Sequence, residues 1–577
     1  MTVRESLASA LFAAGMATRS RTAWRRLMAA AESPQEAQHR ALRAILFELQ
    51  DTQLGRSLGY HRMRGLDEFR TGVPIHDYEA LRPHIDRQIE TGLPIVTAER
   101  PTMYARTSGT TGKPKLIPVT TSVIRSLKRA QRAMAYVQHC AFDAFRGRVL
   151  ALAGAVREET LSDGTPAGAA TGLIYQSTSP LIRAKYVLPA EVFEIEDYEL
   201  RYAVMARIAV QYADVSVIAT ANPSTILRLI HEIETDLPWI VDEIAHGGSH
   251  LTGRIAPDRA AAIATAFSAA PDRAPHLRAL IKRGGALAIG DLWPDLRAVM
   301  TWLGGGCAVA AEAVREKLPP AARMIDAGYV ASEVRGTIVV DAERGLALPL
   351  LDDVFFEFVP VDDWNAGRRD TLLLHELGQD SDKGRNQGRD YHILVTTLAG
   401  LARYHMNDVV RVTGTIGATP TLAFLRKGRG VTNITGEKLA EDQVNLAVGT
   451  ILAQTGLRAP FYVLVADAAA ARYTAYIETG AISRQTAETL ADRLDAELRS
   501  LNIEYDTKRG SGRLKPLLLV ALSDGAERAY RAHCVGQGQR EAQFKVLTLQ
   551  NSDEFGFDVT PHIVDQNSER ANANPHR

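Results

Sequence analysis

The sequence predicts an α/β protein with a large N-terminal domain, in which β-sheets are flanked by helices, and a small α/β C-terminal domain. Three observations lead to this prediction. Apolar runs typical of buried strands alternate with helical periodicity, the 577 residues suffice for one large and one smaller core, and a new compact α/β pattern begins after about Gly428. We expect domains at 1–427 and 428–564, followed by a disordered tail at 565–577 that is rich in Asn, Ser and Arg.

The large sheet is expected to consist of strand-to-helix units. The apolar runs 148–156 and 215–219 are typical of buried strands. The second run leads into Asn222-Pro223-Ser224, which indicates a helix start because Asn is a favoured N-cap and Pro is accepted in the first turn. A second strand-to-helix unit has the same pattern. It consists of the apolar run 296–303, the triple glycine Gly304–Gly306 and the helix-forming segment 310–318. Loops at such strand ends are expected to face a ligand.

Further elements follow in both domains. Residues 339–351 are expected to form a hairpin that turns at Glu343-Arg344-Gly345, and 355–359 another strand. In the small domain, 461–465 and 473–478 have the pattern of strands. The helix after them carries leucines at spacings of four, four and three, namely Leu490, Leu494, Leu498 and Leu501.

The charge balance argues against polyanionic partners. Lys plus Arg and Asp plus Glu both total 67, so no excess positive charge is available for nucleic acid or anionic lipid. Cys140, Cys307 and Cys534 lie far apart without a C-x-x-C pair, which is typical of a reducing compartment and excludes a zinc site made of thiolates. The apolar stretch 7–16 is too short to span a bilayer. We therefore expect a cytoplasmic protein with an amphipathic N-terminal helix and neither nucleic-acid nor membrane partners.

A stretch of hydroxyl residues, glycines and lysines runs from Thr107 to Lys115 and precedes Leu116-Ile117-Pro118. Glycines let successive backbone N–H groups converge on an anion, while hydroxyls and a lysine add donors and charge, so the stretch predicts phosphate binding. A Walker loop is excluded because only two residues separate Gly109 and Gly112, and no Ser or Thr follows Lys113. The alternative is an ordinary surface turn.

Two further motifs fit nucleotide chemistry. Tyr329-Val330-Ala331-Ser332-Glu333 follows an expected strand at 323–325, and its carboxylate could hold Mg²⁺ beside a triphosphate. In the segment from Gly400 to Arg411, Asp408 could accept hydrogen bonds from both ribose hydroxyls. Taken singly, each acid could equally be an ordinary loop or surface residue, but the order and spacing of the three motifs favour the functional interpretation.

Together the three motifs resemble those of the plant auxin-responsive promoter family of acyl-acid amido synthetases, a branch of the adenylate-forming (ANL) superfamily. The resemblance extends from about residue 40 to 550 and includes Val73-Pro74-Ile75, Trp293-Pro294, Phe356-Glu357-Phe358 and 395–401. It implies a large N-terminal domain, a small mobile C-terminal domain, a hinge near Arg426 to Gly430, and an active site between the domains.

Four positions depart from the family pattern. Ala331 replaces the first of two serines, Ala402 a tyrosine, His405 an arginine, and Asn407 the glycine before the aspartate. The sequence is therefore identified as a divergent member of the bacterial type. These departures affect the prediction of the acyl substrate and of the amine more than the prediction of the ATP half-reaction.

The resemblance also implies roles for single residues. Lys115, which closes the phosphate motif, Glu333, which would hold Mg²⁺, and Lys545, a mobile lysine in Gln543-Phe544-Lys545, would be catalytic. Ser332 would contact the α-phosphate, Asp408 the ribose, and the triple glycine the adenine. The complete nucleotide-binding set would be Ser108, Gly109, Thr110, Thr111, Gly112, Gly304, Gly305, Gly306, Tyr329, Ser332, Asp408, Arg426 and Lys438.

The expected activity is ATP- and Mg²⁺-dependent. A carboxylate is a poor electrophile, so its oxygen would attack the α-phosphorus of ATP, pyrophosphate would leave, and an acyl adenylate would form. We expect an acyl-acid amido synthetase that passes the acyl group of a small carboxylic acid to an amino acid or other amine. Two alternatives stay open: an acyl-CoA or other carboxylate ligase that uses the same adenylate, and a catalytically silent adenylate-binding protein.

Overall fold

The structure is a computed structural model of the chain. It describes residues 10–107, 115–176, 183–304, 307–377, 389–428, 430–432, 434–435, 437, 439–510, 512–537, 539, 541, 544–552 and 554–564. Among these residues, no helix is long and apolar enough to cross a lipid bilayer.

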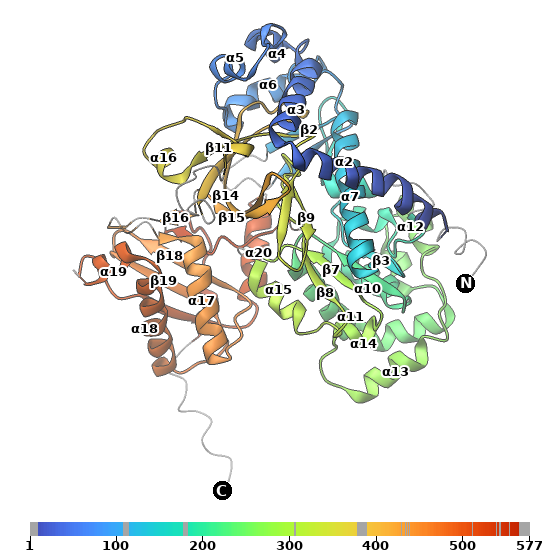
Figure 1. Cartoon of the computed structure of the whole chain (residues 1–577). Coiled ribbons are helices and arrows are strands. Elements are labelled where there is room, and N and C mark those ends of the chain that lie inside the picture. Colours follow the sequence, from blue (N-terminus) through green and yellow to red (C-terminus); the bar gives the residue numbers. More distant parts are fainter. Residues whose placement is uncertain are drawn as a thin grey trace.

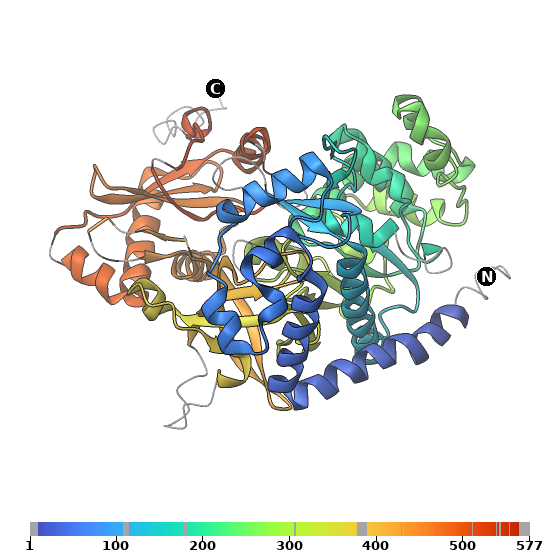
Figure 2. The same ribbon diagram turned by 90° about the horizontal axis from the view of Figure 1, so that it is seen from above.

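Helices form the N-terminal part of the described chain. Residues from Ala10 onward are helical, as expected, and α2 packs along α7 (Thr121–Phe142) at the edge of the molecule (Figure 2). Helix α3 begins at Pro34, which is accepted there because the first helical N–H has no intrahelical partner. The helices before the first strand are η1 (Met16–Ser20), α2 (Arg21–Glu32), α3 (Pro34–Leu49), α4 (Gln53–Leu58), η2 (Tyr60–Arg62), α5 (Leu66–Gly72) and α6 (Tyr78–Thr91).

A small sheet carries the two ends of the first motif. Its strands have the order β2-β1-β5-β4, with bounds β1 (Met103–Thr107), β2 (Lys115–Val119), β4 (Glu159–Thr160) and β5 (Pro166–Gly168). Strands β1 and β2 are antiparallel, and Thr107 pairs with Lys115. The backbone of Lys115 is therefore fixed by the ladder, while residues 108–114 between the strands lie outside the described part.

The expected strand-to-helix units form a parallel sheet of order β3-β6-β7-β8, with strands β3 (Arg148–Ala151), β6 (Val215–Ala219), β7 (Ala298–Thr301) and β8 (Arg323–Asp326). Asn222 caps the next helix by accepting from Ser224 N at 3.0 Å, which confirms the predicted helix start. The run 148–156 forms a strand only as far as Ala151, because the amides of Gly154 and Val156 bond instead to side chains of other segments.

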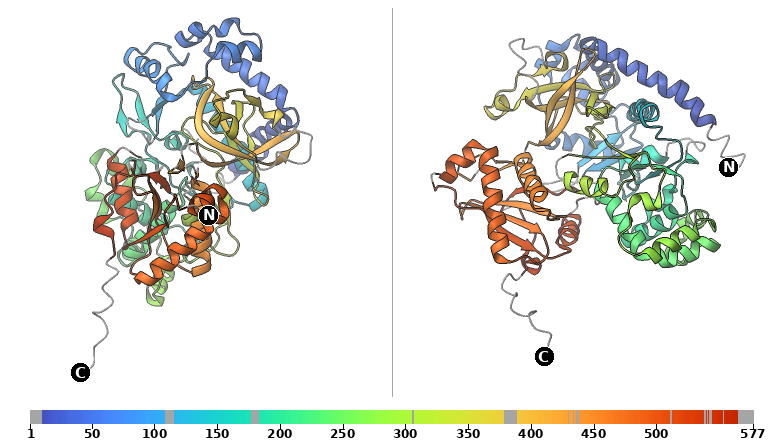
Figure 3. Two further views of the ribbon diagram at one scale, coloured as in Figure 1. Left: turned by 90° about the vertical axis from the view of Figure 1, so that its left-hand side faces the viewer. Right: turned by 60° about the horizontal axis from the view of Figure 1, so that its bottom comes forward.

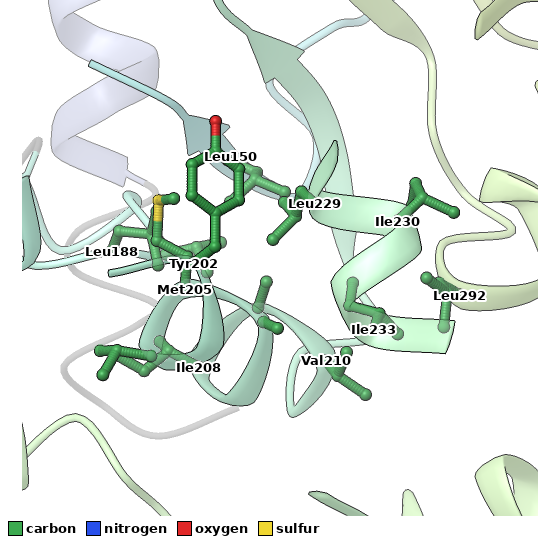
Figure 4. Packing of buried hydrophobic residues seen from close by; sticks show 14 of the residues in the cluster. Leu150, Leu188, Tyr202, Met205, Ile208, Val210, Leu229, Ile230, Ile233 and Leu292 are labelled. Carbon is green, nitrogen blue, oxygen red and sulfur yellow. The ribbon is translucent and has the colours of Figure 1, made fainter. Parts of the chain in front are cut away.

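Helices cover this sheet and supply the largest core (Figures 1 and 4). Apolar residues of α10 (Tyr198–Val210) and α11 (Pro223–His246), such as Ile208 and Ile233, belong to the same buried cluster as strand residue Leu150. Helix α15 lies slightly earlier than the expected 310–318. The helices are α7, α8 (Ala170–Gln176), η3 (Ala190–Glu194), α10 (Tyr198–Val210), α11 (Pro223–His246), η4 (His250–Arg254), α12 (Pro257–Ala264), α13 (Ala274–Arg283), α14 (Ile289–Leu292) and α15 (Ala308–Arg315).

An antiparallel sheet of order β12-β11-β13-β14-β15 holds the third motif. Its strands are β11 (Phe355–Pro360), β12 (Leu372–Leu373), β13 (Asp390–Thr396), β14 (Tyr404–Ile416) and β15 (Thr419–Lys427), accompanied by α16 (Val361–Asn365) and η6 (Leu374–Glu376). The predicted hairpin is confirmed as β9 (Thr337–Asp341) and β10 (Leu346–Pro349). The second core lies between this sheet, the β1–β2 hairpin and α6.

Residues from Leu439 onward form a lobe of their own, orange to red in Figure 3. Its sheet has the order β20-β19-β18-β21, and the predicted leucine-rich helix is α18. Both of its core clusters draw their buried residues from this segment alone. The elements from residue 431 onward are β16 (Val431–Thr432), β17 (Leu439–Ala440), α17 (Glu441–Thr455), β18 (Tyr462–Asp467), β19 (Arg472–Glu478), α18 (Arg484–Leu501), α19 (Ile503–Gly510), β20 (Leu518–Leu522), α20 (Ala526–Gly536), β21 (Leu549–Asn551) and η8 (Thr560–His562).

Candidate active site

Two of the expected catalytic residues meet in the fold. Lys115 is the first residue of β2, and Glu333 lies at the tip of the turn between β8 and β9, which Ala331 N closes by donating to Val334 O at 2.8 Å. The Nζ of Lys115 is 3.7 Å from Oε1 of Glu333. The Glu333 side chain is only 10% exposed, and the Lys115 side chain is 31% exposed, so both charges are shielded yet reachable.

A tyrosine that we did not predict as a site residue joins this pair. The hydroxyl of Tyr404, in β14, accepts a hydrogen bond from Lys115 Nζ at 3.1 Å and donates a longer one to Glu333 Oε1 at 3.5 Å. Burial, followed by the Glu333 charge, raises the pKa of Tyr404 far above its usual range, so the phenol stays neutral. Its place within the third motif was the only sequence signal that could have identified it.

The second and third motifs also meet directly. The hydroxyl of Tyr329 donates to Oδ2 of Asp408 at 2.7 Å, and Asp408 is only 1% exposed. The Tyr329 ring lies parallel to the ring of Phe424, with centroids 6.0 Å apart. Asp408, a residue of the third motif, is thus anchored by Tyr329 of the second motif. This contact places the carboxylate that is expected to bind ribose beside the loop that carries Glu333.

Two residues of the third motif, Asn407 and Arg403, have local structural roles. Asn407, where the resemblance leads us to expect glycine, has φ of +54°, a left-handed conformation that Asn tolerates better than most residues. The preceding Arg403 binds both carboxylate oxygens of Glu357, at 3.0 and 3.1 Å, and the carbonyl oxygens of Arg70 and Val73. Arg403 is therefore an anchor of the fold in this structure, and it accounts for Glu357 within the apolar strand β11.

His405, where the resemblance leads us to expect arginine, lies in an aromatic cluster. Its Nε2 is 3.1 Å from Nδ1 of His392, and its ring stacks on Trp364 with centroids 3.9 Å apart. The guanidinium of Arg369 covers Trp364 at 3.8 Å. The cluster borders the expected hinge, because a Cβ added to Gly428 would lie 2.7 Å from Cε1 of His392.

The loop after β7 is tied to the second motif by Asp326. Its Oδ2 accepts from Leu303 N at 2.9 Å, and its Oδ1 accepts from Gly328 N at 2.6 Å. Sequence reasoning missed Asp326, since only the fold shows that its carboxylate spans both loops. Gly304 lies in this loop, whereas Gly305 and Gly306 are outside the described residues.

Lys545 lies on aromatic rings near these motifs. Its Nζ is 4.0 Å from the ring of Trp302 and 5.2 Å from the ring of Phe424, which stacks on Tyr329. Asn222 donates to the Phe544 carbonyl oxygen, and Arg201 forms an ion pair with Glu541 at 3.7 Å. The C-terminal segment is thereby docked on α10 and on the start of α11, which cover the large sheet, and Figure 1 shows α20 beside α15.

The expected ligands fall partly inside and partly outside the described residues. Ser332 occupies the same turn as Glu333 and is partly buried, and the backbone of Arg426, in β15, pairs with that of Val409, in β14. The side chain of Arg426 lies outside the described part. So do the remaining residues of the expected set, namely Ser108, Gly109, Thr110, Thr111, Gly112 and Lys438.

The residues present fit a magnesium ion bound together with a nucleotide. Mg²⁺ is commonly held by one or two carboxylates plus substrate phosphates. Glu333 offers one shielded carboxylate oxygen next to a lysine suited to phosphate. Among the described residues, no group of three or more His, Cys, Asp and Glu side chains could hold a metal ion alone.

Comparison with solved structures identifies the fold. A structure titled AtGH3.15 acyl acid amido synthetase in complex with 2,4-DB superposes with a TM-score of 0.81 at 19% identity and covers 94% of this chain and 96% of its own. A 2-hydroxyisobutyryl-CoA ligase in the postadenylation state gives a TM-score of 0.52 at 13% identity, covering 91% and 90%. The fold is therefore that of adenylate-forming enzymes, as predicted.

Two of the curated relatives extend over most of the chain. A probable indole-3-acetic acid-amido synthetase of Oryza sativa subsp. japonica is 26% identical over 560 residues, which cover 89% of this chain and 90% of the relative. A jasmonoyl–L-amino acid synthetase of Nicotiana attenuata is 24% identical, with 71% and 72% covered. A GH3 domain-containing protein of Homo sapiens is 28% identical, with 47% and 52% covered.

Family models match in three consecutive segments. The GH3 family N-terminal domain matches residues 23–321, the central domain 347–427 and the C-terminal domain 442–554. GH3 is the auxin-responsive family whose motifs the sequence resembles, so that prediction is confirmed. Because the matched segments make up most of its length, the chain belongs to the GH3 family.

Proposed function

We propose that this chain is an ATP-dependent acyl-acid amido synthetase, which adenylates a small carboxylic acid and transfers the acyl group to an amino acid or other amine. The observation that carries the proposal is the convergence of Lys115, Glu333 and Asp408 from three distant segments. The relatives named above are an indole-3-acetic acid-amido synthetase and a jasmonoyl–L-amino acid synthetase, which supports this class of reaction.

In the first half-reaction the residues hold charge and orientation. Lys115, at the end of the phosphate motif, would donate to phosphate oxygens and offset the charge that develops as pyrophosphate leaves. Glu333 would hold Mg²⁺, which supplies further charge compensation on the phosphates. Asp408 would accept from the ribose hydroxyls, and Tyr329 fixes the position of that carboxylate. Positioning and electrostatics suffice, so no covalent enzyme intermediate is required.

The remaining nucleotide ligands extend this proposal. Gly304, Gly305 and Gly306 would line the adenine, and Ser332 would contact the α-phosphate. Ser108, Gly109, Thr110, Thr111 and Gly112 would wrap the phosphates, and Arg426 and Lys438 would complete the site. The two hydrogen bonds that Asp326 accepts, from Leu303 N and Gly328 N, support this arrangement. They fix the loop after β7 and the loop that leads into the second motif relative to each other before any ligand binds.

We further propose a lid that consists of residues 428–564, with 1–427 as the fixed domain and 565–577 as an unstructured tail. The separate sheet and cores after Leu439 support this division. Lys545, at the end of the lid, would reach the reacting phosphate in one orientation and leave it in the other. Gly428 would absorb the rotation.

The experiment identifies the product. Purified protein is incubated with ATP, Mg²⁺ and a panel of small carboxylic acids, each with a mixture of amino acids or with coenzyme A, and the products are analysed by mass spectrometry. The proposal predicts amide products and AMP, which depend on Lys115 and are unaffected by changing the exposed Lys282 of α13 to Ala. Thioester without amide would instead identify an acyl-CoA ligase, and nucleotide binding without any product a silent binding protein.

A further inference from the structure

A single hydroxyl stands between the two charged groups of the site. Lys115 and Glu333 are 3.7 Å apart, which is longer than the roughly 2.7–2.9 Å of a direct charge-assisted hydrogen bond. The Tyr404 hydroxyl contacts both, at 3.1 Å from Nζ and 3.5 Å from Oε1. The cation and the carboxylate are close to each other without being fully engaged.

The direction of these hydrogen bonds follows from the donors available. An ammonium group has only donors and a carboxylate only acceptors, whereas a phenol has one donor and can also accept. Lys115 must therefore donate to Tyr404, and Tyr404 to Glu333. Because burial and the Glu333 charge keep the pKa of Tyr404 high, the bridge between the two charges is neutral.

The fold fixes the hydroxyl independently of its two partners. Tyr404 is fully buried and pairs with Val395 of the neighbouring strand. On its other side, Arg403 O accepts from His76 N at 3.1 Å and His405 N donates to His76 O at 2.8 Å. The backbone of Tyr404 is thus held from both sides, so its ring has a position that does not depend on Lys115 or Glu333.

We propose that Tyr404 is a positioning residue, which holds Lys115 and Glu333 apart so that the cation stays available for phosphate and the carboxylate for the metal ion. Without the hydroxyl, the two charges would close into a direct ion pair, which nucleotide and Mg²⁺ would have to break. This inference rests on the proposed function, because Lys115 and Glu333 matter only if the chain binds ATP and Mg²⁺.

The test compares two tyrosines that differ in their partners. Tyr404→Phe keeps the buried ring and removes only the hydroxyl. Tyr60→Phe is the matched control, because Tyr60 is also buried and its hydroxyl has no hydrogen-bond partner among the described residues. Metal binding is measured with Mn²⁺ as the probe, by loss of the free-ion electron paramagnetic resonance signal in the presence of a non-hydrolysable ATP analogue. Acid-dependent pyrophosphate exchange is measured as a function of Mg²⁺.

We expect Tyr404→Phe to weaken Mn²⁺ binding about tenfold and to raise the half-saturating Mg²⁺ concentration by a similar factor, since a hydrogen bond to a charged group is lost. Tyr60→Phe should change neither value. In the Glu333→Gln background, Tyr404→Phe should add little further loss, because both changes act on one interaction.

Three results would overturn the role of Tyr404: unchanged Mn²⁺ affinity and Mg²⁺ dependence in Tyr404→Phe, full additivity with Glu333→Gln, or loss of cooperative unfolding, which would make the hydroxyl a requirement of the fold. If the wild-type protein shows no acid-dependent exchange with any acid, the proposed function fails instead. The two failures are therefore distinguished by the wild-type measurement.

Discussion

Lys115 and Glu333 carry the charge on which the proposed chemistry depends. Both side chains are partly shielded from water, Glu333 more than Lys115, so each can act on a ligand in a site of reduced dielectric. Asp408 is buried more deeply and is oriented by Tyr329. The surroundings of Lys115, Glu333 and Asp408 therefore suit them to different roles: the first two to bind charged ligands, and Asp408 to hold a fixed orientation.

Removal of either charged partner should slow adenylation. We expect Lys115→Ala and Glu333→Gln each to lower the rate of acid-dependent pyrophosphate exchange by on the order of a hundredfold, because both stabilise charge that develops on the phosphates. Thermal unfolding should stay close to that of wild type. Near-normal exchange in either variant would remove that residue from the chemistry.

The nucleotide pocket depends on Asp408. A charge-assisted hydrogen bond contributes about 1.5–3 kcal/mol, so Asp408→Ala should weaken ATP and AMP binding by roughly ten- to a hundredfold. Tyr329→Phe should weaken binding less, since it leaves the carboxylate in place without its anchor. Isothermal calorimetry measures both affinities, and equal AMP affinity in Asp408→Ala and wild type would contradict the assignment.

At the scale of elements, His76 joins the segment before α6 to the third motif. Its Nδ1 is 2.9 Å from the carbonyl oxygen of Ala402, so the neutral ring donates there. Burial lowers the pKa of His76 below its usual value of 6.5. In the pH range just below 6.5 the folded protein therefore binds fewer protons than the unfolded chain, and stability falls with falling pH.

This difference predicts a measurable pH dependence. The contribution of His76 should be complete above about pH 6.5 and should decline as the pH is lowered below that value, down to the lowered pKa of the folded state. His76→Asn, which cannot titrate, should lose part of that decline in urea unfolding experiments. An identical pH profile in wild type and His76→Asn would show that other groups cause the acid sensitivity.

Gly428 connects β15 to the C-terminal lobe in a confined position. Its N–H donates to Asn407 O at 2.8 Å, and an added Cβ would lie 2.6 Å from Oδ1 of Asn407. Gly428→Ala should therefore slow at least one half-reaction several-fold while the core stays folded. Gly253→Ala is the control, because a Cβ there meets nothing within 4 Å. Full activity in Gly428→Ala would argue against a hinge at this residue.

Much of this arrangement could be predicted from sequence, because many of its elements are determined by residues that are close together in the chain. Strands such as β6 and β18, the Asn222 cap and the leucines of α18 depend on periodicity and on chemistry within a few residues. Tyr404, Asp326 and the Arg403–Glu357 pair could not be predicted, because their roles come from contacts between distant segments. Strand β3 is shorter than its apolar run for the same reason.

At the scale of the whole molecule, the C-terminal segment is fastened near the proposed site to α10 and α11, which cover the large sheet. Glu541 and Phe544 contact Arg201 and Asn222, and Arg531 donates to Ser224 Oγ at 3.1 Å. These contacts place Lys545 against Trp302 and Phe424. The same segment would have to be released if the lid changes orientation between half-reactions.

Lys545 should consequently be needed in only one half-reaction, since one lysine cannot reach the phosphates in both orientations. Lys545→Ala should impair adenylation and leave aminolysis of a supplied acyl adenylate largely intact. Lys515→Ala, which changes an exposed lysine of the same lobe, serves as the control. Equal loss of both half-reactions in Lys545→Ala would favour a fixed C-terminal lobe.

The central claim is that this chain forms an acyl adenylate. The most direct measurement is exchange of labelled pyrophosphate into ATP, with and without each carboxylic acid of a broad panel, in wild type and in Glu333→Gln. We predict exchange that appears only when a suitable acid is present and that falls by on the order of a hundredfold in the variant. Exchange that is independent of acid, or equal in the two proteins, would contradict the claim.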